Sequence, residues 1–247
     1  MLTPAGPKVV CTVPTYDEAE NIGDLARELL ALGPNVEVLV VDDDSPDGTW
    51  RLVQEAMEGE PRLHLLHRTT DRGRGAAGRD GFVMALEMGA EVVIEMDADF
   101  SHHPRFIPDM LQRLDTEGDS CGLVLGSRGV TGGTDSDRGA IRRGITLAAN
   151  TFIRLVLGVG VRDCNSGFRC WRATTLRHIK VAETFSTGPA IVQELLLKTA
   201  RAGIGISEIP IEFIDRVRGE STLNMRILVG GYLTVLRLRW MIMRGKL

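Results

Sequence analysis

The sequence lacks long apolar runs, paired cysteines and a surplus of either charge. No stretch of more than ten residues is free of Asp, Glu, Lys and Arg, so we expect no membrane-spanning helix, which needs about 20 apolar residues. The four cysteines form no C-x-x-C pair, which argues against zinc and disulfides and favours free thiols in a reducing compartment. A net charge of −4 gives no reason to expect a nucleic-acid partner.

The N-terminal residues lead into an apolar strand pattern without the apolar core of a signal peptide, so we expect a cytoplasmic protein. Apolar residues make up 43% and charged residues 25% of the 247 positions, which is typical of a soluble globular protein. No internal repeat or low-complexity linker divides the chain. We therefore expect one main domain at 1–222 and a C-terminal basic, amphipathic helix at 223–247.

Strand and helix patterns alternate over the first half of the chain. Clusters of β-branched and other apolar residues predict strands at 8–13, 36–41, 62–66, 91–96 and 123–125. Helical periodicity predicts helices between these strands and later at 141–157 and 188–201, followed by a strand at 205–213. This alternation predicts an α/β protein with a doubly wound, mostly parallel sheet.

Two carboxylates, Asp97 and Asp99, directly follow the strand predicted at 91–96, and Pro104 opens the next helix. Open α/β sheets bind their ligands at the carboxyl ends of the strands. Hard oxygen ligands at this place suit Mg²⁺ or Mn²⁺ bound to a diphosphate. Exposed turn acids are the alternative, but the order of strand, D-x-D and helix favours a binding site.

Three adjacent carboxylates, Asp42 to Asp44, follow the strand predicted at 36–41 and need donors or a cation nearby because they repel one another. The segment from Asp43 resembles the start of a calcium loop, but position twelve is Gln54 rather than Glu. Contact with a nucleotide ribose fits better, and Ser45 and Asp47 acting only as a helix cap is the alternative.

The run from Gly73 to Gly78 matches G-x-G-x-x-G but follows the third predicted strand, which is the wrong context for a dinucleotide-binding turn. We expect residues 68–79 to form a loop, either basic and near phosphates or without a ligand. Adjacent residues cannot easily chelate one ion, so turn or capping roles are favoured for His102 and His103.

Basic residues gather towards the C-terminus. From Arg216 onward the chain has seven Lys or Arg and one acid, Glu220. The last helix could dock on the domain core, or it could lie on anionic lipid or bind a partner subunit. The sequence leaves these alternatives open.

Six short motifs follow one another in order along nearly the whole chain. They are Val-Pro-Thr-Tyr-Asp-Glu, Asp-Asp-Asp-Ser-Pro-Asp-Gly-Thr, Met-Asp-Ala-Asp-Phe-Ser-His-His-Pro, Gly-Ser-Arg, Asn-Ser-Gly-Phe-Arg and Arg-x-x-Gly-Glu-Ser. They resemble the polyprenyl (dolichyl) phosphate mannose synthases, which are inverting family 2 glycosyltransferases of GT-A fold. The resemblance implies a GDP-mannose donor, a polyprenyl phosphate acceptor and a divalent cation, Mg²⁺ or Mn²⁺. It also implies a product used for cell-surface glycan, lipoglycan or protein glycosylation.

The resemblance assigns the donor site residue by residue. Asp97 and Asp99 would meet the metal and the diphosphate, with Ala98 lining the site. The guanosine would be held by Pro14, Tyr16, Glu18, Val41 and Asp43.

The resemblance also assigns the remaining charges. Arg128 and Arg216 would neutralise the donor phosphates, and Asp163 would contact the transferred sugar. Arg138 and Arg142 would receive the acceptor phosphate, although from the residues alone they could equally form a solvated helix face. The catalytic set implied in this way is Asp99, Arg128 and Asp163.

The chain departs from the family at two points. Thr222 stands where the family commonly has Lys, so one phosphate contact is missing or comes from elsewhere. The membrane-spanning C-terminal domain of some members is also missing, which makes the basic terminal helix the expected contact with the cytoplasmic face of a membrane or with a membrane-embedded partner subunit.

Charge predicts the mechanism of such a transfer. A phosphate monoester has a second pKa near 6, so the acceptor is already an anionic nucleophile at neutral pH and needs no strong general base. Two alternatives stay open at this point. One is a related transferase that uses UDP-glucose or another sugar nucleotide, and the other is a non-catalytic subunit that binds a nucleotide sugar.

Overall fold

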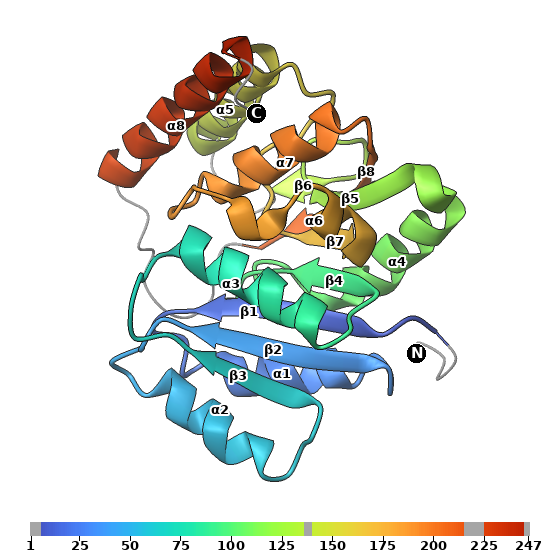
Figure 1. Cartoon of the computed structure of the whole chain (residues 1–247), viewed down its shortest axis with the longest axis vertical. Helices are drawn as coiled ribbons and strands as arrows, with labels where there is room; N and C mark the ends of the chain where they lie inside the picture. The colour runs from blue at the N-terminus through green and yellow to red at the C-terminus, as the bar shows by residue number, and fades with distance from the viewer. Residues whose placement is uncertain (1–5, 136–139, 215–224, 245–247) are drawn as a thin grey trace.

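The structure is a computed structural model that describes residues 6–135, 140–214 and 225–244, without the side chains of 140–143 and 225–229. Within these residues a seven-stranded sheet has helices on both faces, and α5 and α8 lie side by side at one end (Figure 1). Strands run in the order β3-β2-β1-β4-β7-β5-β8. The strands of this sheet are β1 (Val9–Thr15), β2 (Val36–Asp42), β3 (Leu63–His67), β4 (Val92–Glu95), β5 (Cys121–Ser127), β7 (Arg169–Arg172) and β8 (Gly205–Pro210).

The sheet is mostly parallel, as the alternating pattern predicted. The pairs β1–β2, β1–β4, β2–β3 and β5–β8 are parallel, and only β7 runs antiparallel, between β4 and β5. The sequence pattern missed β7 because Arg169 is fully buried within it, which breaks the apolar run. The Arg169 guanidinium donates to the carbonyls of Ser166 (2.8 Å), close by in the chain, and Val192 (2.7 Å), on α7, while its Nη2 is buried without a hydrogen-bond partner among the described residues.

The strand predicted at 205–213 is two strands. Strand β8 ends at Pro210, which has no N–H to continue a ladder, and the chain then forms β9 (Glu212–Phe213). Strand β9 pairs in parallel with β6 (Thr134–Asp135) in a separate two-stranded sheet. This small sheet brings the segment after β5 alongside the segment after β8.

Helices occupy the positions that their periodicity predicted, with different bounds, and the short α6 was not predicted. They are α1 (Ile22–Leu30), α2 (Thr49–Met57), α3 (Arg74–Glu87), α4 (Ile107–Thr116), α5 (Ala140–Leu157), α6 (Ala173–His178), α7 (Ile191–Arg201) and α8 (Met225–Met243), with 3-10 turns η1 (Pro104–Phe106), η2 (Gly118–Ser120) and η3 (Val181–Glu183). None of the helices in the described ranges combines the length and apolarity needed to cross a bilayer.

The expectation of a loop over 68–79 is wrong in its second half, because α3 begins at Arg74. The Thr187 carbonyl accepts hydrogen bonds from the backbone N–H groups of Gly75 (2.9 Å) and Ala76 (3.2 Å). A segment more than a hundred residues away therefore satisfies two amides of the first helical turn, which are then not available to a phosphate.

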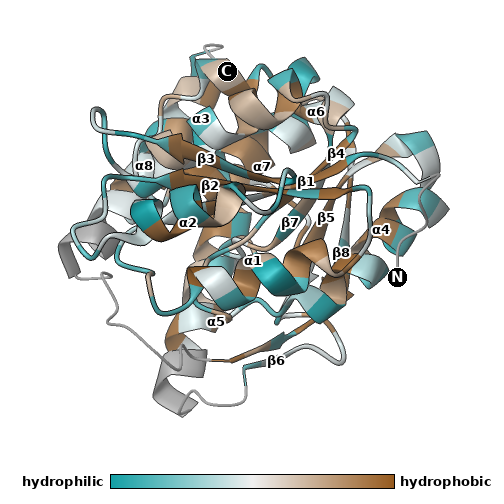
Figure 2. Cartoon of the chain, turned by 90° about the horizontal axis from the view of Figure 1, so that it is seen from below, coloured by the Kyte–Doolittle hydropathy of each residue, from teal (hydrophilic) through white to brown (hydrophobic). Residues whose placement is uncertain are grey.

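Alternate residues of the central strands enter two separate apolar cores. Val10 packs on one face of the sheet with Leu39, whereas Val9 and Val38 pack on the other face. Figure 2 shows this apolar sheet between helices whose outer surfaces are more polar. Full burial of each such side chain contributes roughly 1.5–3 kcal/mol to the stability of the fold. The polar strand ends are therefore attached to a well-packed core.

Candidate active site

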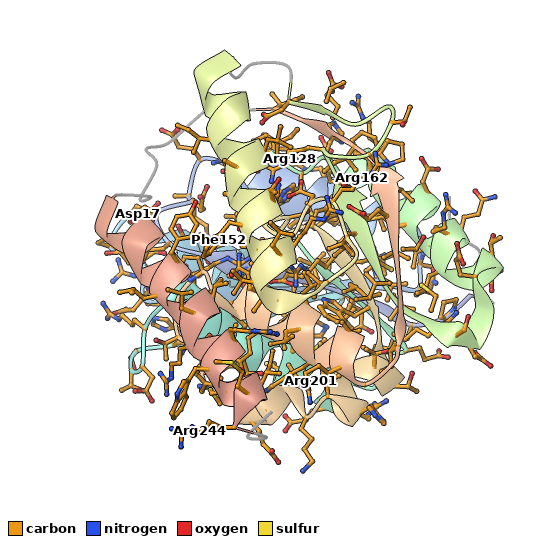
Figure 3. All side chains as sticks on the ribbon, turned by 90° about the horizontal axis from the view of Figure 1, so that it is seen from above. Asp17, Arg128, Phe152, Arg162, Arg201 and Arg244 are labelled. Atoms are coloured by element: carbon orange, nitrogen blue, oxygen red, sulfur yellow. The ribbon has the colours of Figure 1, made fainter. Side chains whose placement is uncertain are left out.

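Polar side chains from several strands meet at the carboxyl edge of the sheet. The parallel strands β1, β2, β4 and β5 all end at this edge, with Asp42, Asp97 and Arg128 at or just beyond their ends. Since β7 is antiparallel to β4 and β5, its first residue lies at the same edge and brings the loop 163–168 there. Arg128 is shown beside α5 in Figure 3.

Each of the three adjacent carboxylates after β2 has its own donors. Asp42 accepts from the Thr15 hydroxyl (2.7 Å) and from both the backbone N–H (2.9 Å) and the hydroxyl (2.6 Å) of Ser45. Asp43 is bound by the Arg68 guanidinium and by the backbone N–H of Gly73 at 2.7 Å. The predicted need for donors or a cation is thus met by protein groups.

Asp44 is satisfied by two further side chains. His67 Nε2 lies 3.0 Å from its Oδ1, and Arg72 pairs with its Oδ2. Asp47 accepts from the backbone N–H groups of Thr49 (2.9 Å) and Ala19 (2.9 Å), as a cap of the α2 start would. Partial burial raises the pKa of Asp47, but the hydrogen bond from the Thr49 hydroxyl (2.6 Å) and these two backbone hydrogen bonds outweigh it and hold the pKa below its ordinary value.

Asp97 lies next to a cation that the sequence did not indicate. Arg74 Nη2 donates to Asp97 Oδ1 (3.1 Å) and lies 3.4 Å from Glu95 Oε1. Burial lowers the pKa of Arg74, but Asp97 and Glu95 outweigh it and raise the pKa above its ordinary value. In the sequence, Arg74 is marked only by its place in a Gly/Arg segment. Its partner Asp97 follows a different strand, so the pairing is not visible locally.

Asp99 is more enclosed than Asp97. The Asp97 side chain is 41% exposed, whereas Asp99 is 7% exposed and accepts from the backbone N–H of Ser101 at 3.0 Å. The intervening Ala98 is buried in the apolar core, which fixes the backbone between the two carboxylates. The pair therefore presents one open and one enclosed carboxylate at the end of β4.

The two adjacent histidines differ in role. His103 Nδ1 accepts from the backbone N–H of Arg105 (3.2 Å) at the start of η1, which confirms its predicted capping role. His102 is buried instead, with its ring stacked on Phe168 at 5.3 Å and its Nδ1 3.7 Å from Asp97 Oδ2. Burial lowers the pKa of His102 below its ordinary value despite the nearby acids, which favours the neutral ring.

Arg128 and Asp163 form a buried, two-pronged ion pair. Arg128 donates to the Asp163 carboxylate through Nε (2.7 Å), Nη2 (2.9 Å) and the backbone N–H (3.2 Å). Burial raises the pKa of Asp163, but the hydrogen bonds and charge of Arg128 outweigh it and hold the pKa below its ordinary value. Asn150 on α5 lies 3.4 Å from the same carboxylate. The structure thus pairs Arg128, which was expected at a donor phosphate, directly with Asp163, which was expected at the transferred sugar.

The residues expected to hold the guanosine lie along the ends of β1 and β2. Pro14 and Val41 are register partners, and Val41 is buried. Tyr16 is 46% exposed, and Glu18 accepts from Asn21 Nδ2 at 2.7 Å. These residues and Asp43 therefore lie at one end of the sheet.

Some predicted site residues lie outside the described part of the chain. They are Arg138, Arg216 and Thr222, and for Arg142 only its backbone, within α5, is described.

The carboxylates at the end of β4 fit a divalent cation whose remaining ligands come from a bound substrate. Asp97 and Asp99 offer two hard oxygen donors, and the described residues contain no group of three or more His, Cys, Asp or Glu arranged for a metal. Mg²⁺ is commonly bound by one or two carboxylates plus substrate phosphates, and such a site is complete only with its nucleotide.

The mostly parallel sheet with carboxylates at the carboxyl ends of its strands is the arrangement of a GT-A fold. Residues 11–179 match the pattern described as Glycosyl transferase family 2, and the chain belongs to this family. This confirms the fold class and the kind of enzyme that the sequence motifs indicated.

Two curated relatives are each 37% identical. One is the undecaprenyl-phosphate mannosyltransferase of Micrococcus luteus, aligned over 244 residues that cover 97% of this chain and 99% of the relative. The other is the polyprenol monophosphomannose synthase of Mycolicibacterium smegmatis, aligned over 218 residues that cover 88% and 81%. The resemblance to mannose synthases is confirmed.

A solved structure with the same fold is glucosyl-3-phosphoglycerate synthase from Mycobacterium tuberculosis in complex with Mn²⁺ and UDP-glucose. It aligns with a TM-score of 0.69 over 94% of this chain and 80% of that chain, at 20% identity. At this identity the likeness concerns the fold alone.

Proposed function

We propose that the protein transfers mannose from GDP-mannose to polyprenyl phosphate with inversion at the anomeric carbon, using Mg²⁺ or Mn²⁺. The observation that carries the proposal is the convergence of Asp97, Asp99 and the Arg128–Asp163 pair at one sheet edge. The names of the two relatives, both mannosyltransferases of polyprenyl-type lipids, support the acceptor class.

Positioning and charge carry most of this reaction. The acceptor phosphate is anionic at pH 7 and attacks without a strong base, so the protein has to align two anions and stabilise the leaving diphosphate. When bound, the cation would neutralise charge on that diphosphate. On the protein side Asp97 and Asp99 hold the donor end, and a diphosphate that reaches Arg128 competes with Asp163 for the guanidinium.

Replacing Asp99 by Asn tests the proposal. The amide keeps the shape and can still accept from Ser101, but it weakens the cation site, so we expect mannosyl lipid formation to fall by more than about 100-fold. The assay follows radiolabelled mannose from GDP-mannose into extracted polyprenyl phosphate, with and without Mn²⁺. The matched control is Asp109→Asn, at an exposed aspartate on α4. Wild-type activity in Asp99→Asn with the fold intact would contradict the proposal.

We further infer that α5 and α8 form the surface that meets the lipid on the cytoplasmic face of a membrane. Val235 and Leu238 are buried in the core and anchor α8, and Phe152 of α5 lies 5.4 Å from Tyr232 of α8 between their ring centroids (Figure 3). Large apolar side chains on both helices are nevertheless exposed: Ile145, Leu147 and Leu155 on α5, and Tyr232, Leu233, Leu236, Trp240 and Met243 on α8.

Cations accompany these apolar side chains on α8. The Arg237 guanidinium lies over the Phe185 ring at 4.8 Å, and that of Arg244 over Trp240 at 5.0 Å. Apolar side chains beside Lys and Arg are typical of helices that lie in a membrane interface rich in anionic lipid. A lipid-phosphate acceptor held in the membrane would then approach the protein from the side that carries α5 and α8.

Leu155→Asp tests this surface, because it places a charge at an exposed position on α5. We expect weaker sedimentation with anionic phospholipid vesicles, while Leu52→Asp on α2, also at an exposed leucine, leaves it unchanged. Equal losses in both variants, or none in either, would contradict the assignment. If the wild-type protein sediments only with vesicles that also contain a second membrane protein, the surface binds a partner subunit instead of lipid.

A further inference from the structure

Arg74 is a cation at the carboxyl edge of the sheet that lies outside all six sequence motifs. It is the first residue of α3, where a positive charge opposes the helix macrodipole. The backbone N–H of Gly73, just before it, donates to Asp43 at 2.7 Å. The backbone N–H of Gly75, just after it, donates to the Thr187 carbonyl at 2.9 Å. The fold therefore fixes the backbone of Arg74, and only contacts of its side chain can offset the unfavourable position of the charge.

One amino group of Arg74 is shared between two carboxylates. Its Nη2 donates to Asp97 Oδ1 at 3.1 Å and lies 3.4 Å from Glu95 Oε1. The two acids differ in exposure, since the Glu95 side chain is 1% exposed and the Asp97 side chain 41%. Glu95 is thus held within the fold, whereas the carboxylate of Asp97 has room to turn away from the guanidinium.

The pair of Arg74 and Glu95 is incompletely bonded. Within the described part of the chain, Arg74 Nη1 and Glu95 Oε2 are buried and have no hydrogen-bond partner. Buried polar atoms in folded proteins are nearly always hydrogen-bonded, so two such atoms need an explanation. One is a donor and the other is an acceptor. If the guanidinium turns from Asp97 towards Glu95, the two atoms can bond to each other, which lowers the cost of releasing Asp97.

The guanidinium is enclosed beside the D-x-D rather than extended into solvent. A Cβ at Gly78 would lie 3.3 Å from Arg74 Nη1. A Cβ at Gly167 would lie 3.6 Å from both Arg74 Nη2 and Asp97 Oδ2. The ion pair therefore lies between the first turns of α3 and the loop 163–168, and small rotations are the movements open to it.

The acids at the end of β4 need positive charge nearby. Glu95, Asp97 and Asp99 lie within five residues and repel one another, and the Arg74 guanidinium offsets part of this repulsion without any bound ion. A divalent cation that takes Asp97 as a ligand would lie close to the guanidinium, and the two positive charges repel each other. The affinity for the cation is then reduced to the extent that the protein keeps Asp97 on Arg74.

We propose that Arg74 competes with the divalent cation for Asp97, so that the protein binds the cation weakly until the nucleotide is present. The inference rests on the proposed use of Mg²⁺ or Mn²⁺. In the free protein Asp97 stays paired with Arg74. A nucleotide diphosphate brings further oxygen ligands and negative charge, which favour the state in which Arg74 has turned to Glu95 and Asp97 is released. Arg74 is thus a positioning residue that makes the cation and the donor bind together.

Mn²⁺ binding to the nucleotide-free protein tests the competition, with the unbound ion followed by electron paramagnetic resonance. We expect Arg74→Leu to bind Mn²⁺ about tenfold more tightly than the wild type, since a hydrogen bond between charged groups no longer has to be broken. Arg74→Lys keeps a cation beside Asp97 and should stay within about threefold of the wild type. The control is Arg79→Leu, on the same helix, which removes an arginine paired with Asp80 and should leave the affinity unchanged.

The sign of the change separates competition from a structural role. If Arg74 only holds Asp97 in place for the cation, Arg74→Leu binds Mn²⁺ more weakly than the wild type. That result, or an unchanged affinity, would overturn the inference and leave the proposed mannosyl transfer standing. A wild-type protein that binds Mn²⁺ neither alone nor with GDP would overturn the proposed cation itself.

A second pair of variants decides if Arg74→Leu does not fold because Glu95 is left buried without its partner. Glu95→Gln removes that charge, so Glu95→Gln is compared with the double variant Arg74→Leu/Glu95→Gln. The double variant should bind Mn²⁺ about tenfold more tightly than Glu95→Gln alone. Equal or weaker binding by the double variant would overturn the inference.

Discussion

Replacing Asp163 by Asn should destabilise the fold because it leaves a buried cation without its counter-charge. Asp163 is 0% exposed and accepts three hydrogen bonds from Arg128, whose side chain is only 12% exposed. Removing one partner of a buried pair costs about 3–5 kcal/mol. The amide of Asn still accepts from one Arg128 donor, so we expect the lower end, about 3 kcal/mol.

This loss is measurable by heat or by urea. For a domain of this size, 1 kcal/mol corresponds to about 2–4 °C in Tm, so the variant should melt roughly 6–12 °C below the wild type. Urea titration at 25 °C gives the free energy of unfolding directly, and an unchanged m-value shows that the same surface is exposed in both proteins.

A double-mutant cycle separates the pair from the rest of the site. Arg128→Met removes the cation, so Asp163→Asn in that background no longer leaves a charge unpaired. We expect the double variant to be more stable than the sum of the single effects predicts, by about 1–3 kcal/mol. Additive losses would refute the reasoning, because they would show that the two side chains stabilise the fold independently.

The pH dependence of the same cycle has a defined sign. The pKa of Asp163 is raised by burial but lowered more strongly by Arg128, so it lies below the unfolded value of about 3.9. A carboxylate with a lowered pKa stabilises the fold above the unfolded pKa and loses that contribution as pH falls through the folded pKa. The difference in unfolding free energy between wild type and Asp163→Asn should be complete at pH 7 and should narrow below about pH 4.

Two further predictions concern packing and thiols. Gly75→Ala should destabilise the fold by about 1–3 kcal/mol in urea titration, because its Cβ would lie 2.5 Å from the carbonyl oxygens of Ser186 and Gly188. Gly23→Ala on α1 has no atom within 4 Å of its Cβ and should stabilise by about 0.4–1 kcal/mol, and the opposite order would contradict the packing. All four cysteines are buried, and burial raises the pKa of Cys11 to about 12, so a disulfide reagent at pH 8 should label them only after unfolding. Rapid labelling of the folded protein would show that a thiol is accessible.

Sequence periodicity predicted the features that depend on local pattern. The strands that carry the sheet are runs of buried β-branched residues, and the D-x-D follows one of them at the edge where such sheets bind ligands. The kind of enzyme also followed from the motifs. Each of these signals is local, since it depends on residues that are neighbours in the sequence.

Contacts between distant segments could not be predicted. The start of α3 depends on the Thr187 carbonyl, and the buried Arg169 of β7 donates to the Val192 carbonyl of α7. The partnership of Arg74 with Asp97 joins a helix start to a strand end, and nothing in either segment indicates the other. Each of these features is fixed by tertiary structure, which overrides local preference.

The place of β7 in the sheet also constrains the order in which the chain can fold during synthesis. Strands β1 to β4 are made early and can pair with one another, but β4 has β7 as its other neighbour and β5 has β7 and β8. Until residues 169–172 leave the ribosome, β4 is an open edge with unpaired backbone groups, which can pair with another chain. Insertion of β7 closes long loops on both sides, so it is slow by the general relation between contact separation and folding rate. Insertion of β7 thus brings the loop 163–168 to the edge that carries Asp97 and also covers the open side of β4.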